Sequence, residues 1–235
     1  MCRTCGCDDH DHHHHHHHHR RISLETDLLA KNDRIAEALR ARLEHERIVA
    51  LNLIGAPGAG KTTLLEHTIR ALGSVPMAVI EGDQATDHDA QRIASAGCAV
   101  HQVNTGTGCH LDASMIERGL AAVWPRPGSL LFIENVGNLV CPALFDLGER
   151  AKVVAMSITE GDDKPLKYPH IFRAASVLVL TKVDLAPHLD VDPARCIDHA
   201  RRINPDLTVF PVAAPRGHGM AEWVGWLRGQ LEAAS

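Results

Sequence analysis

Short apolar runs alternate with amphipathic stretches along most of this chain. Seven runs have the nearly continuous apolar character of buried strands, at residues 48–54, 77–81, 100–103, 130–133, 153–157, 177–180 and 208–212. Five stretches repeat apolar side chains every three or four positions and are predicted to be helices, at residues 61–72, 85–96, 112–123, 193–203 and 220–233. Strands of this kind, separated by helices, form a mostly parallel sheet covered on both faces, so we expect an α/β fold.

The part of the chain ahead of the first strand divides in two. Over residues 23–46, apolar side chains recur at helical spacing and Ser23 is a suitable N-cap, so we predict a leading helix packed on the main domain. Residues 1–22 hold cysteines, aspartates and a histidine run but no apolar stretch to bury, so we expect a tail that is disordered without a ligand. The predicted organisation is a Cys/His-rich tail, 1–22, followed by one domain, 23–235.

Composition and charge narrow the class of function. The chain has 235 residues, 45% of them hydrophobic, which is enough for a proper core. Its formal net charge is −5 and it has no basic stripe, so we expect no nucleic-acid partner. No apolar stretch reaches the length of a membrane span and the N-terminus lacks a signal-peptide core, so we expect a cytoplasmic protein without a membrane partner. Its seven cysteines are then free, metal-bound or redox-active.

A phosphate-binding loop follows the first predicted strand. Residues 55–62 read G-A-P-G-A-G-K-T, which is the pattern G-x-x-x-x-G-K-[ST] between a strand and a helix. The glycines let successive backbone N–H groups face a phosphate, the lysine supplies a positive charge for the β/γ oxygens, and the threonine supplies a hydroxyl for Mg²⁺. The predicted nucleotide-binding residues are Gly55, Gly58, Gly60, Lys61, Thr62 and Thr63. We therefore expect a nucleoside triphosphatase.

Acidic residues end two of the other predicted strands. Glu134 closes one strand and Gly137 follows three residues later, which suits a Mg²⁺ carboxylate and a backbone N–H for the γ-phosphate. Asp83, at the end of another strand, is a candidate for the metal side or for positioning water. Ordinary polar turns remain the alternative for both. We predict Mg²⁺ ligands Thr62, Asp83 and Glu134, and catalytic residues Lys61, Asp83, Glu134 and Gly137.

The predicted base-binding element is Thr181-Lys182-Val183-Asp184, directly after an apolar strand. One carboxylate, here Asp184, accepts both the N1–H and the 2-amino group of guanine, and the stem of Lys182 lies on the face of the base. The common form of this element begins with Asn, so Thr181 weakens the case for guanine. The small residue Ala213 suits backbone contact to the guanine carbonyl oxygen. We expect GTP and GDP as ligands, and Lys182 and Asp184 argue against an ATP-driven partitioning or reductase-type protein.

Two sets of soft metal ligands occur, and the first is in the tail. The thiolates of Cys2, Cys5 and Cys7 suit Zn²⁺ or Ni²⁺, although a loose reactive thiol tail is the alternative. An eight-histidine run follows, which binds divalent metals in bulk and acts as a buffer unless it is a purification tag. Its members are His12, His13, His14, His15, His16, His17, His18 and His19.

The second set of soft ligands lies inside the domain. Cys109, His110 and Cys141 form it, and Cys141 comes four residues after Gly137, so this metal site is close to the predicted γ-phosphate sensor. Three ligands are too few for a closed tetrahedral site, and a two-fold dimer would bring two such sets together. Buried packing is the alternative for any single cysteine, and it is the interpretation that we apply to Cys98 and Cys196.

Several long motifs resemble those of the HypB family of hydrogenase nickel-incorporation GTPases. They are Met1-Cys2-x-x-Cys5-Gly6-Cys7, residues 55–62, E-G-D-Q at 81–84, G-C-H-L-D at 108–112, E-N-V-G-N-L-V-C-P at 134–142 and K-P-L-K-Y-P at 164–169. The resemblance implies a P-loop GTPase of the SIMIBI class, the class of signal-recognition-particle and MinD proteins. It implies a nucleotide-dependent homodimer that delivers nickel to the large subunit of [NiFe]-hydrogenase with a small zinc-containing partner chaperone, HypA. It also implies a high-affinity nickel motif in the tail and a domain site for Zn²⁺ or Ni²⁺.

Two other interpretations stay open beside this resemblance. The urease accessory GTPase shares the phosphate loop and a Cys-Pro pair, but there His follows the proline, whereas Ala143 follows Pro142 here. A nickel-storage protein with a vestigial GTPase would also explain the histidine run. Since no arginine finger can be identified in the sequence, we expect slow turnover.

Overall fold

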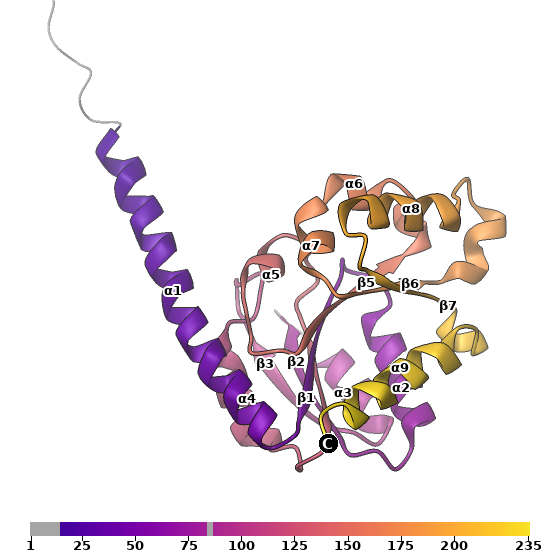
Figure 1. Cartoon of the computed structure of the whole chain (residues 1–235), viewed down its shortest axis with the longest axis horizontal. Helices are drawn as coiled ribbons and strands as arrows, with labels where there is room; N and C mark the ends of the chain where they lie inside the picture. Colours follow the sequence, from indigo (N-terminus) through magenta and orange to yellow (C-terminus); the bar gives the residue numbers. More distant parts are fainter. Residues whose placement is uncertain (1–14, 84–86) are drawn as a thin grey trace, which may run out of the picture.

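The computed structural model describes residues 15–83 and 87–235 (Figure 1), with side chains from residue 27 onward. Seven strands form one sheet in the order β3-β2-β4-β1-β5-β6-β7, and every neighbouring pair is parallel. The strands are β1 (Val49–Ile54), β2 (Met77–Asp83), β3 (Ala99–Asn104), β4 (Leu130–Glu134), β5 (Ala151–Ser157), β6 (Val177–Thr181) and β7 (Thr208–Val212). The predicted α/β class and all seven predicted strands are confirmed.

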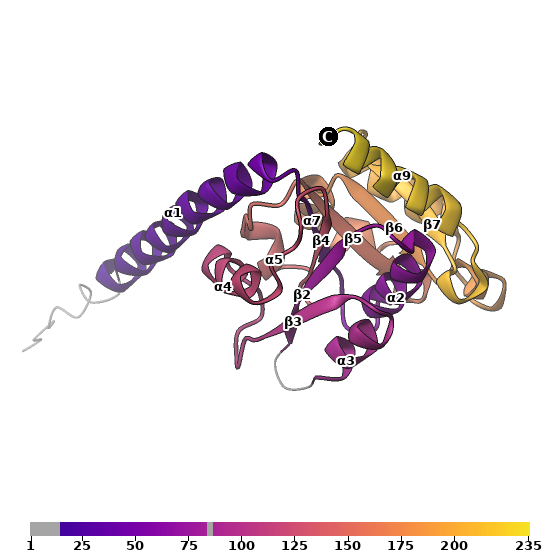
Figure 2. The same ribbon diagram turned by 90° about the horizontal axis from the view of Figure 1, so that it is seen from below.

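Helices cover both faces of this sheet (Figure 2). On one face α2 (Lys61–Leu72), α3 (His88–Ser95) and α9 (Met220–Glu232) share a core with β1, in which Leu65, Ile93 and Trp223 are buried. On the other face lie α4 (Ala113–Val123), α7 (Pro169–Ala174) and α8 (Pro193–Ile203). The strand residues alternate between the two cores, which is why their sequence reads as nearly continuous apolar runs.

The five predicted internal helices are present, two of them with the predicted bounds. Helices α2 and α8 match residues 61–72 and 193–203, and α4 and α9 differ by one residue at an end. The helix predicted over 85–96 is α3, which begins at His88 after the undescribed residues 84–86. Three short helices were not predicted: α5 (Cys141–Leu144), α6 (Lys164–Lys167) and α7. Their four to six residues are too few for a hydrophobic period to be recognised.

The leading helix differs from its prediction. Helix α1 (His15–His45) starts eight residues before Ser23, so Ser23 lies inside the helix and is not its N-cap. The helix therefore includes residues 15–22, which the sequence assigned to the tail. No Gly or Pro interrupts residues 15–45, so nothing in the local sequence stops the helix where the apolar period begins. Its C-terminal half packs Ala36, Leu39 and Leu43 against α4, and its N-terminal half extends beyond the domain (Figure 1).

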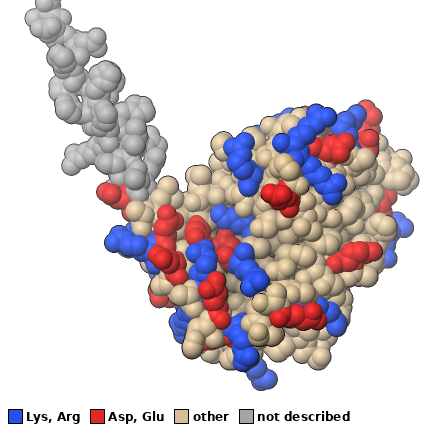
Figure 3. All heavy atoms as spheres, viewed as in Figure 1, with Lys and Arg blue, Asp and Glu red and all other residues tan. Residues whose placement is uncertain are grey.

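The surface carries both signs of charge. On the face shown in Figure 3, Lys and Arg side chains are interspersed with Asp and Glu over the domain. Among the helices in the described ranges, none combines the length and the apolar character that crossing a bilayer requires.

Candidate functional site

The phosphate loop lies at the carboxyl end of β1, where ligands bind in sheets of this kind. Gly58 and Gly60 take positive φ values of 75° and 89°, which side chains with a Cβ rarely adopt. Gly55 lies so close to β5 that a Cβ there would be 2.4 Å from the Ala155 carbonyl oxygen. Lys61 is buried and its Nζ donates to the Gly55 carbonyl, 3.4 Å away. The loop therefore has the backbone shape that turns N–H groups toward a bound anion.

A cavity of about 500 Å³ opens in front of this loop. Nine of the predicted residues line it together, although they come from four separate segments: Gly58, Gly60, Lys61, Thr62, Thr63, Asp83, Glu134, Gly137 and Lys182. Gly137 approaches the phosphate loop closely, since a Cβ there would lie 2.9 Å from Cγ of Pro57. The parallel sheet brings the ends of β1, β2 and β4 to one edge, and this edge forms the wall of the cavity.

Thr62 and Glu134 meet inside this cavity. The Thr62 hydroxyl donates to Oε1 of Glu134 over 2.8 Å. Glu134 is 2% exposed, and its Oε2 has no hydrogen-bond partner among the described residues. Burial raises the pKa of Glu134 to about 7, although Lys61 and the Thr62 hydrogen bond both lower it. A buried carboxylate with one oxygen unsatisfied, beside a hydroxyl, is a donor set that fits Mg²⁺.

Sequence reasoning missed a second buried carboxylate, Glu81. It pairs in register with Glu134 on the neighbouring strand, is 3% exposed, and its Oε2 also has no partner among the residues described. The pKa of Glu81 is raised to about 8, first by burial and then by the nearby charges of Glu134 and Asp83. The available signal was a charged residue inside an apolar strand. Asp83, which was preferred because it ends β2, lines the same cavity.

The predicted base-binding residues are connected to the phosphate loop. The Thr181 hydroxyl lies 2.6 Å from the Ala59 carbonyl oxygen and donates to it, and Nζ of Lys182 donates to the Gly58 carbonyl over 2.7 Å. Thr181 thus anchors this segment to the phosphate loop although it is not Asn. Asp184 accepts a 2.7 Å hydrogen bond from Nε of Arg216, a residue that sequence reasoning did not select.

Ala213 is already engaged within the chain. Its backbone N–H donates to the carbonyl of His218 over 3.0 Å, which closes the turn after β7. In this arrangement the N–H of Ala213 is not free to bind the guanine carbonyl oxygen. Its contribution is to the shape of the turn beside Asp184.

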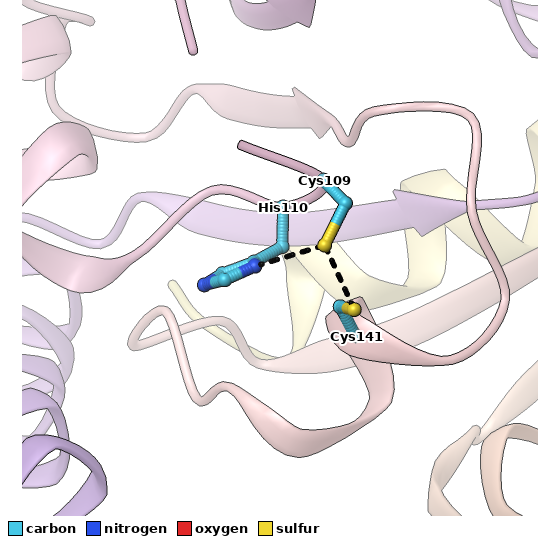
Figure 4. A group of neighbouring side chains, drawn as sticks. All are labelled: Cys109, His110 and Cys141. Carbon is cyan, nitrogen blue, oxygen red and sulfur yellow. Dashed lines mark hydrogen bonds between the residues drawn. The ribbon is translucent and has the colours of Figure 1, made fainter. Parts of the chain in front are cut away.

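The three soft ligands of the domain meet in one cluster (Figure 4). Sγ of Cys109 lies 2.8 Å from Sγ of Cys141 and 3.7 Å from Nδ1 of His110, and the three ligand atoms lie within 4.8 Å of one another. The His110 ring stacks on Phe145 with centroids 3.9 Å apart. The hydrogen bond with Cys141 raises the pKa of Cys109, and burial lowers the pKa of His110. The two thiols and the imidazole suit Zn²⁺ or Ni²⁺ and are all half-exposed.

Hydrogen bonds connect this cluster to the phosphate cavity. The side chain of Asn138 donates to the Cys109 carbonyl over 3.2 Å, and the same residue forms a backbone bridge with Gly55 of the phosphate loop. Asn135, next to Glu134, accepts from the backbone N–H of Leu111 over 3.2 Å. Residues 134–141 thus contact both sites.

The side chains of the predicted tail ligands lie outside the described part of the chain. Cys2, Cys5 and Cys7 and the first histidines, His12 to His14, lie outside the described residues. The backbone of His15 to His19 belongs to α1, and their side chains are not described. The predicted metal-binding role of residues 1–22 therefore remains a prediction.

The parallel sheet, the phosphate loop and the carboxylates at its strand ends define a P-loop nucleotide-binding protein. The CobW/HypB/UreG nucleotide-binding domain matches residues 49–211. A hydrogenase maturation factor HypB from Azotobacter chroococcum is 57% identical over 212 residues, 90% of this chain and 70% of the relative. The chain therefore belongs to the HypB family of hydrogenase maturation factors.

Solved structures agree with this assignment. HypB from Archaeoglobus fulgidus is 42% identical, with a TM-score of 0.81 over 86% of this chain and 100% of that one. HypB from Helicobacter pylori, solved in complex with nickel, is 33% identical, with a TM-score of 0.81 over 86% of this chain and 96% of that one. The 54 kDa signal recognition particle protein of Aeropyrum pernix, 15% identical with a TM-score of 0.51 over 79% of this chain and 48% of that one, shares the fold alone. The expected SIMIBI-class fold is confirmed.

Proposed function

We propose that this protein is a GTP-hydrolysing nickel metallochaperone that delivers Ni²⁺ during the maturation of [NiFe]-hydrogenase. The observation that carries the proposal is the segment 134–141, which has a buried carboxylate of the phosphate cavity at one end and a thiol of the soft-ligand cluster at the other. Asn135 and Asn138 bond this segment to the loop of Cys109. A change at the γ-phosphate would thus move a metal ligand.

The phosphate cavity performs the nucleotide chemistry in this proposal. Lys61 and the loop N–H groups bind the phosphates, and Asp184 and Lys182 select and cover guanine. Thr62 and Glu134, with Asp83 and Glu81 at the same wall, would hold Mg²⁺, which neutralises charge on the β and γ oxygens. Gly137 would donate its N–H to the γ-phosphate. When that phosphate leaves, the segment that follows Gly137 is released.

The soft-ligand cluster binds the metal ion that is delivered in this proposal. Cys109, His110 and Cys141 supply three ligands, so a homodimer formed in the GTP state would complete a shared site for Ni²⁺ or Zn²⁺. Hydrolysis weakens the dimer, and nickel passes to the hydrogenase large subunit with a HypA-type zinc/nickel chaperone as partner. All of this takes place in the cytoplasm. By linkage, nickel must change the affinity for nucleotide by the same factor as nucleotide changes the affinity for nickel.

The N-terminal residues have a separate role in the proposal. Cys2, Cys5 and Cys7 bind one nickel tightly, and the histidine run stores further ions without selecting one geometry. Deleting residues 8–19 separates storage from delivery. Loss of metal capacity with intact hydrogenase maturation at ample nickel would identify the run as a buffer.

Nickel binding in different nucleotide states tests the proposal. Equilibrium dialysis of the tag-free protein is compared in the nucleotide-free, GDP and GTP-analogue states, beside a Cys109→Ala/Cys141→Ala variant. We expect one class of nickel sites to depend on nucleotide and to disappear in the variant. Nickel binding that ignores both nucleotide and variant would contradict the delivery mechanism and leave storage as the function.

A further inference from the structure

Positive charge is scarce at the phosphate cavity. Four carboxylates among the described residues line it, namely Glu81, Asp83, Asp89 and Glu134. Three cationic side chains line it too, and two of them belong to predicted nucleotide-binding motifs, Lys61 and Lys182. The third is Arg92 of α3, which no motif in the sequence singled out.

Contacts on two helices hold Arg92 at the phosphate end of the cavity. Its Nη2 donates to the hydroxyl of Thr63 over 3.1 Å and to Oε2 of Glu66 over 2.6 Å, and its Nη1 donates to Asp89 over 3.2 Å. Thr63 directly follows Thr62 of the phosphate loop, so the guanidinium lies beside the phosphate-binding residues. Burial alone would lower the pKa of Arg92, but Glu66 and Asp89 outweigh it and raise that pKa, so the group keeps its charge.

The guanidinium retains donors for a ligand. It has five N–H groups in one plane, and the three hydrogen bonds to Thr63, Glu66 and Asp89 occupy three of them. The side chain is 42% exposed and lines the cavity, and its Nε–H and one Nη1–H remain as donors. Its charge also acts on the buried carboxylate of Glu134, whose pKa it lowers.

We propose that Arg92 is a catalytic residue of the hydrolysis, donating from its remaining N–H groups to the γ-phosphoryl oxygens of the bound triphosphate. This inference rests on the proposed GTPase function. The water oxygen adds to the γ-phosphorus while the bond from that phosphorus to the β–γ bridging oxygen breaks, and its electron pair stays on GDP. The two protons of the water leave on inorganic phosphate as H₂PO₄⁻. Arg92 stabilises the charge on the γ oxygens during this transfer, as an arginine supplied by the same chain.

The fold supplies this arginine where the sequence indicated none. Arg92 lies 31 positions after Lys61 and outside any nucleotide motif, so only the packing of α3 beside α2 brings it to the cavity. The expectation of slow turnover was based on the lack of such a residue and loses that basis. Glu66 and Asp89 hold the guanidinium in place before the nucleotide binds, which is the preorganisation that makes such a charge effective.

Arg92→Ala in the full chain tests this role, with Mg²⁺ present and single-turnover GTP hydrolysis as one readout. The second readout is the affinity for GDP with aluminium fluoride, which mimics the transferring phosphoryl group. We expect hydrolysis to fall about 100-fold or more and the aluminium fluoride complex to weaken by a similar factor. Affinity for GDP alone should stay within about threefold, since GDP lacks the γ-phosphoryl group. Arg92→Lys should recover part of the loss.

Two further variants separate catalysis from a structural role. Glu66→Gln removes one of the two charge partners of Arg92 but keeps a side-chain oxygen that can accept from it. Because Asp89 and Thr63 remain, we expect the hydrolysis rate to fall less than about fivefold. Arg70→Ala, an exposed arginine in the last turn of α2 outside the cavity, is the matched control for loss of a positive charge. Equal losses in Arg92→Ala and Glu66→Gln would reduce Arg92 to a clamp between α2 and α3. An Arg92→Ala variant that binds GDP with aluminium fluoride like the parent protein would overturn the proposal, whereas a parent protein that hydrolyses no GTP would refute the GTPase function itself.

Discussion

The phosphate cavity and the soft-ligand cluster are joined by one short segment but are built differently. Glu134 and Glu81 of the cavity are 2% and 3% exposed and lie on adjacent strands of the sheet. Cys109, His110 and Cys141 are half-exposed, and they lie on the loop before α4 and at the start of the four-residue helix α5. A site on strands keeps its geometry, whereas a site on loops can change it when a neighbouring ligand leaves. The difference suits the proposed function, in which a fixed nucleotide site drives a variable metal site.

Replacing the buried carboxylate is the change that should damage the cavity most. For Glu134→Gln we expect GTP hydrolysis in Mg²⁺ to fall about 100-fold or more, because a neutral amide cannot replace a carboxylate at the metal. Nickel binding in the nucleotide-free state should remain, since the soft-ligand cluster is untouched. Thermal melting without Mg²⁺ serves as the folding control, and this variant should melt at or above the parent temperature because it removes a buried charge. Hydrolysis within a few-fold of the parent rate would exclude Glu134 from the reaction.

The reciprocal change removes the soft ligands. For Cys109→Ser with Cys141→Ser we expect nickel affinity of the tail-deleted domain to fall about 100-fold or more, because thiolates are the preferred donors for such ions. Affinity for GDP should change by less than about threefold, since neither cysteine lines the cavity. Cys98→Ser is the matched control, because Cys98 is buried and packs in the core of the other sheet face. Isothermal titration calorimetry with nickel and with GDP measures both affinities. A parallel loss of GDP affinity would mean that the two regions are not separate sites.

The connection itself can be weakened through Asn138. In Asn138→Ala the side-chain bond to the Cys109 carbonyl is lost while the cluster and the cavity keep their own residues. Coupling between two sites is typically about 5- to 150-fold in affinity, and we expect the ratio of nickel affinities in the GTP-analogue and GDP states to approach one. The nickel affinity averaged over the GTP-analogue and GDP states should change little. If that ratio stays at the parent value, the coupling follows another route.

The smallest expected effect is a pH dependence of the cavity without Mg²⁺. The pKa of Glu81 is raised from 4.5 in the unfolded chain to about 8 in the folded one, so between these values the folded state holds a proton that the unfolded state has lost. The contribution of Glu81 to the free energy of unfolding should therefore be greatest near and below pH 4.5 and decrease as the pH rises through about 8. We expect the melting temperature to fall by a few degrees over this range in the parent protein and less in Glu81→Gln. An unchanged slope in Glu81→Gln would assign the pH dependence to other groups.

The sequence by itself determined the elements with long, regular patterns. Buried parallel strands read as apolar runs, so all seven were predicted, and α2 and α8 matched their predicted bounds. The phosphate loop and the cluster of Cys109, His110 and Cys141 could be predicted because their residue types and spacing suit the chemistry of phosphate and soft metals. The start of α1 was not, because helix propensity alone carries a helix beyond its apolar period.

Only the tertiary structure decided which distant residues face one another. Arg92 and Glu81 entered the phosphate cavity because α3 packs beside α2 and because β2 pairs with β4, and no local motif marks either pairing. The bonds of Asn135 and Asn138 to the Cys109 loop likewise join segments 24 and 29 residues apart. A sequence motif specifies chemistry within a loop, whereas contacts across the sheet depend on strand order and packing, which the whole chain determines together.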